Sequence, residues 1–189
     1  MIKFIKHFIL NPIEVGSVIP SSRSLAKVIT ETADLSHKRC VVEFGPGTGA
    51  FTCEITKRVP ADAVSFAIEI NEDFVKEIHR KCPEALVYHA SAQTVQKILS
   101  DHNVKKCDCI ISSLPWTGFS ESLQSELMDI SLDILNHGGI FLTFEYVYNQ
   151  FLPGGRRYDN ILKNRFSSVK KTKVVWKNFP PAFVYYCEK

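Results

Sequence analysis

Short apolar segments alternate with helical patterns along this 189-residue chain, and this alternation limits the folds open to it. Each of five apolar runs reads as a buried strand: 40–44, 64–70, 85–89, 107–112 and 140–147. Helical patterns occur at 49–59, after the cap residue Asn71, at 92–101, at 120–136 with His137-Gly138-Gly139 as the stop, and at 157–165. Four strand–helix–strand units in a row predict an α/β fold with a parallel, helix-covered sheet.

Segments outside this alternation lie at both ends of the chain. The last two apolar segments, 169–177 and 182–187, are close enough to pair as a hairpin, which would insert one antiparallel strand. At the other end, residues 1–10 read as a helix stopped before Pro12, and residues 22–33 as a second helix capped by Ser21 or Ser22.

The net charge of +3 hides an uneven distribution. Residues 1–150 carry 14 basic and 18 acidic side chains, whereas residues 151–189 carry 9 basic and 2 acidic. The C-terminal fifth is therefore a basic segment on a mildly acidic body. The composition excludes collagen-like, disordered and disulfide-scaffold proteins, and no stretch approaches the ~18 apolar residues of a membrane span.

The six cysteines are expected to be reduced thiols, because no signal peptide is recognised in the sequence. Cys107 and Cys109 lie two apart in a predicted strand, so their side chains are expected to point the same way. Without a second cysteine pair or paired histidines, buried structural thiols are expected there and no metal site.

A glycine-rich loop, Glu43 to Gly49, follows the first predicted strand. Its glycines let the backbone turn tightly and approach a ligand closely. The spacing Gly45-x-Gly47-x-x-Ala50 also fits a dinucleotide fingerprint, but Pro46 removes an amide donor and Glu43 would repel a pyrophosphate. A cationic ligand with an amino group fits better, and S-adenosylmethionine has both a sulfonium and an α-ammonium.

Glu69 ends the second predicted strand 24 residues after Gly45, near the ~20 expected for an acid that binds ribose hydroxyls. Taken alone, it could equally be an ordinary solvated acid at a strand end. Because it follows Glu43 and the glycines, we interpret Glu69 as the ribose ligand.

Five segments together resemble the bacterial phospholipid N-methyltransferases: GSVIPSS (16–22), VVEFGPGTGAFT (41–52), AIEIN (67–71), ISSLPW (111–116) and NFPPAFVYY (178–186). The resemblance spans nearly the whole chain in the same order, and the related ornithine-lipid N-methyltransferases are similar too. It implies a class I, Rossmann-like methyltransferase fold with a seven-stranded, mostly parallel sheet, one antiparallel strand and helices on both faces.

The resemblance also implies an activity and a location. It implies a cytoplasmic enzyme, bound peripherally to the inner face of the cell membrane, that uses S-adenosyl-L-methionine to methylate phosphatidylethanolamine and releases S-adenosyl-L-homocysteine. Residues 1–35 would then be helices that cap the membrane or substrate side, and 36–189 the cofactor-binding domain. The expected cofactor contacts are Glu43, Gly45, Gly47, Thr48, Gly49, Glu69, Ile70, Ser91, Ala92 and Ser112.

One position departs from the family pattern. After strand three the family usually has Gly-Asp-Ala, whose Asp would hold the adenine amino group, whereas this chain has Ala90-Ser91-Ala92. A serine accepts a hydrogen bond but carries no charge, so we expect weaker or differently anchored adenine binding.

The acceptor amine is expected at the carboxyl ends of the strands, near Ser113, Leu114 and Trp116. Trp116 would offer a π face to a cationic nitrogen, although a turn with a packed tryptophan is the alternative. Glu145, Tyr146 and Tyr148 follow strand five and are candidates to accept the amine's proton, although desolvation of the amine and orientation could suffice.

Candidate donors for a headgroup phosphate are Ser21, Ser22 and Arg23 at a helix start, and Arg156 and Arg157 after a glycine pair. Each set has a plain alternative as a helix cap or a solvated charge.

Contact with an anionic phospholipid membrane is expected from two segments. The basic amphipathic pattern of residues 1–10 suits a headgroup layer, although a helix packed on its own domain is the alternative. Basic side chains near the C-terminus would be attracted to anionic lipid, or would protect an edge strand: Lys163, Arg165, Lys170, Lys171, Lys173 and Lys177.

Two other functions compete with lipid methylation. An RNA adenine-N6 methyltransferase would suit the basic tail and the strand-four motif, but such enzymes usually have Asn at the position of Ser113. A non-catalytic lipid-binding module would suit the loss of the acid at Ser91. We therefore expect a membrane lipid as the acceptor and no nucleic-acid partner.

Overall fold

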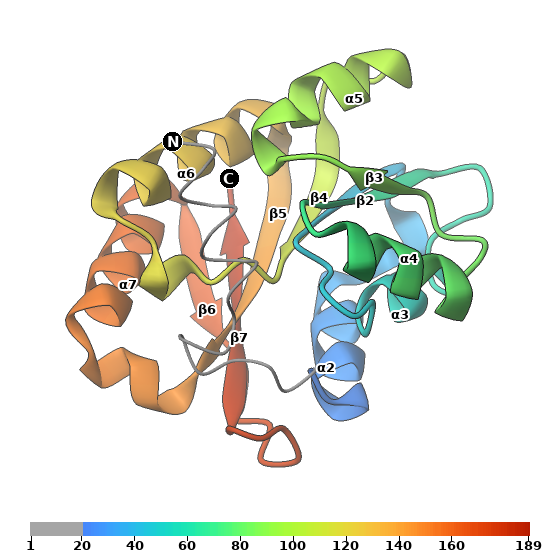
Figure 1. The fold of residues 1–189 in the computed structure, drawn as a ribbon. Helices are drawn as coiled ribbons and strands as arrows, with labels where there is room; N and C mark the ends of the chain where they lie inside the picture. The colour runs from blue at the N-terminus through green and yellow to red at the C-terminus, as the bar shows by residue number, and fades with distance from the viewer. Residues whose placement is uncertain (1–20) are drawn as a thin grey trace.

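The predicted parallel strands lie side by side at the centre of the described chain, residues 21–189 of the computed structural model (Figure 1). The sheet contains β1 Cys40–Phe44, β2 Val64–Glu69, β3 Val87–His89, β4 Cys107–Ser112, β5 Leu135–Tyr146, β6 Ser168–Lys171 and β7 Ala182–Glu188. Their order is β3-β2-β1-β4-β5-β7-β6. β1 to β5 pair in parallel, and β7 runs antiparallel to both β5 and β6. The predicted seven-stranded sheet with one antiparallel strand is thus confirmed.

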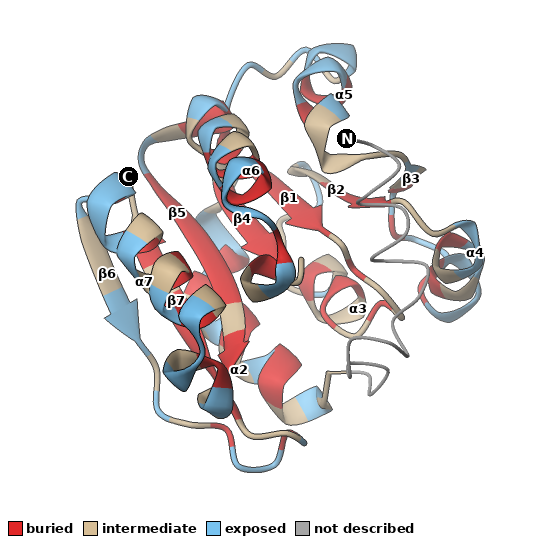
Figure 2. Ribbon diagram, turned by 60° about the vertical axis from the view of Figure 1, so that its left-hand side comes forward, coloured by how far each residue is buried: buried red, intermediate tan, exposed pale blue. Residues whose placement is uncertain are grey.

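Helices cover both faces of this sheet, and the central strands between them are buried (Figure 2). One face packs against α5 Val95–Asp101, α6 Glu121–Ile134 and α7 Pro153–Arg165; the other packs against α2 Arg23–Ala33, α3 Thr52–Thr56 and α4 Glu72–Lys81. The 3-10 turns are η2 Leu35–His37, η3 Ala92–Thr94, η4 Trp116–Gly118 and η5 Val147–Phe151. The helix expected over residues 1–10 lies outside the described residues.

The predicted helix caps are present. The Ser22 hydroxyl accepts a hydrogen bond from the Leu25 amide at 3.1 Å and begins α2. The Asn71 side chain accepts one from the Asp73 amide at 2.9 Å and begins α4 directly after β2. Because each cap satisfies an amide at a helix N-terminus, these starts are local properties of the sequence.

The boundary between α6 and β5 differs from the prediction. The expected stop at His137-Gly138-Gly139 falls inside a longer strand, because α6 ends at Ile134 and β5 begins at Leu135. Leu135 is buried and pairs with Cys107 of β4, so burial and strand pairing override the helical pattern. An irregularity in this pairing between Cys107 and Cys109 also corrects their expected common direction, since the two pack in different clusters of the core.

α7 begins at Pro153, four residues before its predicted start. Proline suits the first turn of a helix, where its missing N–H costs nothing. Gly154 and Gly155 follow because the helix start packs on backbone: an added Cβ would lie 2.3 Å from the Thr117 carbonyl oxygen and 1.9 Å from that of Asn149. The glycine pair therefore fixes α7 against the turns that follow β4 and β5.

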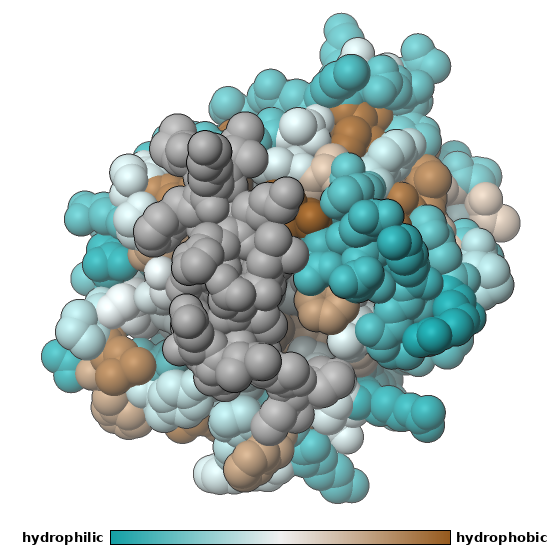
Figure 3. All heavy atoms as spheres, viewed as in Figure 1, coloured by the Kyte–Doolittle hydropathy of each residue, from teal (hydrophilic) through white to brown (hydrophobic). Residues whose placement is uncertain are grey.

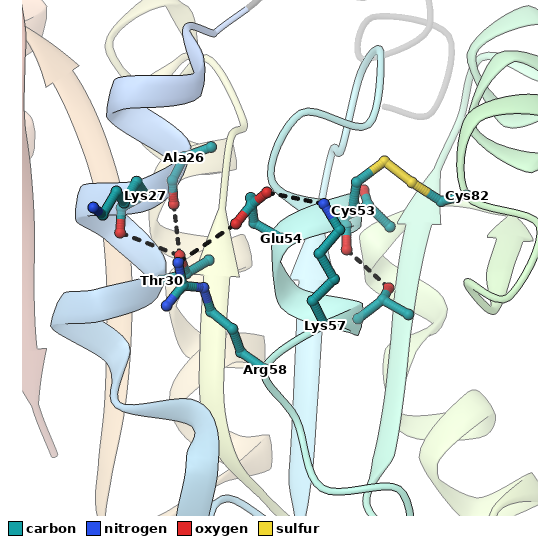
Figure 4. A network of polar contacts seen from close by, with 10 residues as sticks. Ala26, Lys27, Thr30, Cys53, Glu54, Lys57, Arg58 and Cys82 are labelled. Carbon is teal, nitrogen blue, oxygen red and sulfur yellow. Dashed lines mark hydrogen bonds and ion pairs between the residues drawn. A yellow bond between two sulfur atoms is a disulfide. The ribbon is translucent and has the colours of Figure 1, made fainter.

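The expectation of six reduced cysteines is wrong for one pair. Cys53 of α3 and Cys82, the residue that ends α4, form a disulfide with Cα atoms 5.7 Å apart (Figure 4). The pair is formed because α3 and α4 pack on the same face of the sheet, which spacing along the chain does not reveal. The remaining cysteines are buried thiols, as expected: Cys40, Cys107, Cys109 and Cys187.

Alkylation counts test this pairing. Protein purified without reductant, then unfolded and alkylated, is expected to gain four labels by intact mass, because only four cysteines are free thiols. Reduction before alkylation should give six labels, the total in the chain. Six labels without reduction would contradict the disulfide.

Candidate active site

A cleft lies at the carboxyl ends of the parallel strands. This is where ligands bind in open α/β sheets. The cleft is lined by Gly45, Ile68, Glu69, Ile70, Ala90, Ser91, Ala92, Leu114, Phe119 and Leu127. It brings together segments that follow β1, β2, β3 and β4, including predicted cofactor contacts from the first three. Ile68, Ala90, Phe119 and Leu127 were not predicted, because apolar residues carry no sequence signal that separates a cleft lining from the core.

The three glycines of the loop after β1 have different roles. All three have positive φ angles, +65° at Gly45, +54° at Gly47 and +83° at Gly49. A Cβ on Gly45 would lie 2.8 Å from Leu114, and one on Gly49 would lie 2.9 Å from Ile78, so both allow close packing. A Cβ on Gly47 would meet nothing within 4 Å. At Gly47 the positive φ angle, and not close packing, is therefore what favours glycine.

Glu69 at the end of β2 holds this loop in place. Its carboxylate accepts a hydrogen bond from the Gly47 amide at 3.0 Å and another from the Asn71 amide at 2.9 Å. Burial raises the pKa of Glu69, and these backbone amides oppose the rise because they stabilise the ionised form. Each carboxylate oxygen can accept a further hydrogen bond, so Glu69 can support the loop and still bind a hydroxyl in the cleft.

Glu43 of β1 is a buried carboxylate without a hydrogen-bond partner among residues 21–189. Burial raises its pKa to about 8, and the negative charge of Glu69 adds to the rise. The neighbouring Thr52 hydroxyl, itself without a formed hydrogen bond, offsets part of it. An unpaired buried acid beneath a glycine loop fits a cationic ligand, because a positive charge would compensate the cost of ionisation.

Glu43→Gln tests this unpaired acid. Because the pKa of Glu43 is raised in the folded protein, its ionisation destabilises the fold progressively as pH rises toward about 8. The cofactor-free Glu43→Gln variant is expected to have a higher Tm than the wild type, with a larger gain at about pH 9 than at about pH 6. The same variant should bind S-adenosylmethionine more weakly in calorimetry.

A matched control is Glu54→Gln, since Glu54 pairs with Lys57 and Arg58 at the surface and its pKa is lowered (Figure 4). Its effect on Tm should not grow with pH over this interval. A pH-independent gain in Glu43→Gln would show that Glu43 is already paired.

Ser91 lines the cleft but its hydroxyl is already engaged. It donates a hydrogen bond to the Gln93 side chain at 3.2 Å and accepts one from the Gln93 amide at 3.3 Å, which begins η3. Gln93 in turn donates to Glu126 of α6. The serine therefore shapes this wall of the cleft, and Ala90, whose amide donates to the Glu69 carbonyl at 2.9 Å, ties the wall to β2.

Contacts between buried side chains stabilise the Ser112–Trp116 turn. The Ser112 hydroxyl is buried and accepts a hydrogen bond from the Trp116 indole N–H at 2.9 Å. The indole stacks on Tyr158 of α7 with ring centroids 5.2 Å apart. The Trp116 ring is thus part of the core, which corrects the expectation that its face is open to the acceptor amine. Ser113 and Leu114 remain partly exposed, and Leu114 lines the cleft beside Gly45.

Glu145, near the end of β5, is a third buried carboxyl at this end of the sheet, after Glu43 and Glu69. It accepts hydrogen bonds from the Tyr146 amide at 3.1 Å and from the Asn149 side chain. Burial raises its pKa to about 7, although both donors oppose the rise. A carboxyl with this pKa can accept and release protons near neutral pH. The Tyr146 ring lies on the opposite face of the strand and stacks on Tyr148 at 5.7 Å.

The predicted phosphate donors have unequal surroundings. The Arg157 guanidinium donates to Gln124 at 2.8 Å and to the Phe119 carbonyl at 3.0 Å. It therefore fixes the turn that carries Phe119, which corrects its expected role as a free phosphate donor. Arg156 and Arg23 are exposed, and the Ser22 hydroxyl caps α2.

One long-range contact joins two motifs that are far apart in sequence. The Ser22 amide donates to the Asn178 side chain at 2.9 Å across 156 residues, and Asn178 is buried. The Val147 amide donates to the Pro181 carbonyl at 3.0 Å, which brings the turn after β5 to the same place. The helix start at Ser21 and Ser22, the loop before β7 and the segment around Glu145 thus form one wall beside the sheet edge.

Residues 21–189 contain no cluster of His, Cys, Asp or Glu that could hold a metal ion. They also contain no helix long and apolar enough to span a membrane.

A sheet of this order, with a glycine loop after β1 and an acid at the end of β2, defines the class I methyltransferases, whose cofactor is S-adenosyl-L-methionine. Residues 13–137 match the family model described as ribosomal RNA adenine dimethylase, so the chain belongs to that family. The match ends before Glu145, α7 and the loop before β7.

Comparison with individual proteins extends this result. The ornithine lipid N-methyltransferase of Singulisphaera acidiphila is 27% identical over 191 residues, covering 98% of this chain and 92% of that protein. This relative confirms the resemblance to bacterial lipid N-methyltransferases. The ribosomal RNA small subunit methyltransferase A of Cupriavidus metallidurans is 26% identical over 135 residues, covering 70% of this chain but 46% of that protein.

The same fold is present in solved structures. An O-methyltransferase from Bacillus cereus in complex with SAH superposes with a TM-score of 0.72 and 13% identity, covering 99% of this chain and 90% of that one. The family match and the sequence relatives, together with this fold, show that the chain is an S-adenosyl-L-methionine-dependent methyltransferase.

Proposed function

We propose that this methyltransferase N-methylates the primary amine of a membrane-lipid headgroup, with phosphatidylethanolamine as the first candidate and ornithine lipid as the second. The enzyme would act at the inner face of the cell membrane without spanning it.

The proposal rests on Glu145. An aliphatic amine is protonated near neutral pH and must lose a proton before it can attack, whereas the amino group of adenine is already neutral. A buried carboxyl with a pKa of about 7 suits an aliphatic amine, because it can accept the proton of the ammonium group. The neutral amino group of adenine does not need such a carboxyl.

The extent of the likeness to the lipid enzyme supports the same conclusion. It covers the acceptor wall formed by Ser22, Asn178 and the segment around Glu145, whereas the family model ends at residue 137. The part of the chain that would select the acceptor thus resembles a lipid methyltransferase.

In the proposed reaction, bound S-adenosylmethionine supplies a methyl group on a positively charged sulfur. Glu69, Gly47 and the walls around Ser91 and Leu114 would hold its adenosine portion, and the Glu43 carboxylate would balance its positive charge. The Asn149 amide would hold the Glu145 carboxylate oriented, and that carboxylate would accept a proton from the headgroup ammonium and become a neutral carboxyl group. The freed amine would then be held in line with the methyl group, so that positioning supplies much of the rate.

An acceptor panel tests this function. The enzyme is incubated with methyl-labelled S-adenosylmethionine and, separately, with phosphatidylethanolamine vesicles, ornithine-lipid vesicles and ribosomal RNA, and the products are resolved by mass spectrometry. Label in either lipid and none in RNA is the expected result. Label in RNA alone would overturn the proposal, as would binding of the cofactor with no transfer to either lipid.

A further inference from the structure

Large apolar side chains are exposed on two short segments of the described chain. Trp176 and Phe179 are each 74% exposed, and Phe151 is 71% exposed. Tyr148 and Leu152 are also exposed beside Phe151. We call these five residues the hydrophobic edge. Leu86 is the one other large apolar side chain between residues 21 and 189 that is comparably exposed. This concentration indicates an interaction surface, since scattered single residues need no explanation.

The two segments lie next to each other. One is η5 and the residue that follows it, directly after β5; the other is the loop of residues 172–181 before β7. The Val147 amide bonds to the Pro181 carbonyl at 3.0 Å, and the Lys171 ammonium bonds to the Gln150 side chain at 3.1 Å. In Figure 1 the loop before β7 projects from the lower end of the sheet, and in Figure 3 brown side chains occur at the lower edge of the same view.

The charges around the hydrophobic edge are basic. Residues 160–187 contain no Asp or Glu. Lys163 and Lys171 pair with Asp159, but Lys173, Lys177 and Arg156 make no ion pair with any residue from 21 to 189. Exposed aromatic rings beside unpaired lysines suit the headgroup layer of an anionic bilayer, where rings enter the apolar boundary and lysines meet lipid phosphates.

We propose that the hydrophobic edge inserts into the headgroup region of an anionic lipid bilayer. The inference rests on the proposed function, because it would place the wall that contains Ser22, Asn178 and Glu145 against the membrane, where a headgroup can reach it. Asn178 connects the two features: it lies between Trp176 and Phe179 in the loop, and its buried side chain binds the start of α2. Insertion of the loop therefore sets the position of the acceptor wall relative to the bilayer.

Vesicle co-sedimentation tests this surface without any methyl transfer. Wild-type protein is expected to bind vesicles of phosphatidylcholine with phosphatidylglycerol more tightly than vesicles of phosphatidylcholine alone. The double variant Trp176→Ser, Phe179→Ser should lose about tenfold or more of this binding, because two interfacial anchors are removed. Leu86→Ser is the matched control, since it removes an exposed apolar side chain at a different edge of the sheet.

Charge-reversal variants test the role of the lysines beside the hydrophobic edge. Lys173→Glu with Lys177→Glu should abolish the preference for phosphatidylglycerol, whereas Lys97→Glu with Lys105→Glu makes the same charge change elsewhere on the surface and should not. Thermal unfolding establishes that each variant is folded. Equal sedimentation of wild type and the Trp176→Ser, Phe179→Ser variant would overturn the inference, as would wild-type protein that binds neither vesicle.

Fluorescence gives a direct measure of insertion, because the chain has one buried tryptophan, Trp116, and one exposed, Trp176. Vesicles with brominated acyl chains should quench emission from wild type but not from Trp176→Phe, which keeps an aromatic anchor. If the edge were instead a contact between two copies, the Trp176→Ser, Phe179→Ser variant would change the oligomeric state and leave vesicle binding intact. If it bound nucleic acid, RNA would protect Trp176 and vesicles would not quench it.

These results separate from those of the proposed function. If the protein binds vesicles as expected but methylates no lipid, the proposed function is refuted and the membrane-binding role of the hydrophobic edge still stands. If the protein methylates detergent-solubilised lipid but does not bind vesicles, the membrane-binding role of the hydrophobic edge is refuted and the proposed function still stands.

Discussion

Glu145→Gln is expected to slow methyl transfer to a lipid amine by about 100-fold or more, in line with the loss of a general base. Glutamine keeps the size of the side chain and an oxygen that can accept from the Tyr146 amide, but it cannot take up a proton. The affinity for S-adenosylmethionine should not change, because Glu145 lies on β5 and the residues that line the cleft follow β1 to β4. Single-turnover rates and calorimetry measure the two quantities separately.

The dependence of the methyl-transfer rate on pH tests whether Glu145 is the general base. The base acts when ionised, so the wild-type rate should rise with pH up to about 7 and then level off, and Glu145→Gln should lack this rise. Asn149→Ala should move the rise to higher pH, because the Asn149 amide stabilises the ionised carboxylate. Glu121→Gln removes an exposed carboxyl at the start of α6 and serves as the control. An unchanged rate and profile in Glu145→Gln would assign Glu145 a purely structural role.

Glu69→Ala is expected to weaken S-adenosylmethionine binding by more than about tenfold, since hydrogen bonds to a charged group contribute ~1.5–3 kcal/mol each. The variant loses the carboxylate in the cleft and also leaves the amides of Gly47 and Asn71 without their acceptor. Glu72→Ala is the control three positions on, because Glu72 is exposed and pairs with Lys76. Calorimetry gives both dissociation constants, and an unchanged value for Glu69→Ala would remove Glu69 from the site.

A cofactor analogue separates direct contact from loop support. Wild-type protein should bind S-adenosylhomocysteine more tightly than its analogue without ribose hydroxyls, and Glu69→Ala should bind the two alike, as in a double-mutant cycle. If Glu69 only supports the loop, the variant will discriminate between the two ligands as well as wild type does.

The order of strands and helices could be predicted because it depends on local patterns. Apolar runs marked the centres of β1, β2 and β4, and side-chain caps at Ser22 and Asn71 marked helix starts. Boundaries failed where contacts between segments override the local pattern. Leu135 lies in the predicted helix 120–136 but pairs with β4 as part of a strand. α7 begins before its predicted start at residue 157, because its glycines fit against the carbonyls of Thr117 and Asn149.

The candidate residues of the cofactor loop could also be predicted from the sequence, because glycines with positive φ and an acid at a strand end have recognisable sequence signals. Trp116 shows the limit of this approach. A tryptophan after β4 looks the same in sequence whether it faces a ligand or the core, and here the Ser112 hydroxyl and the Tyr158 ring hold it in the core. Arg157 shows the same limit, because its partners, Gln124 and the Phe119 carbonyl, come from another part of the chain.

The sequence by itself determined the class of fold, the cofactor loop and the kind of ligand it suits, because short patterns of apolar, glycine and acidic residues encode them. Only the tertiary structure decided which distant groups meet. It joined Ser22 to Asn178, bonded Cys53 to Cys82, and buried Glu145 deeply enough to raise its pKa to about 7. Burial and long-range contact are properties of the packed sheet and its helices, so no local pattern reports them.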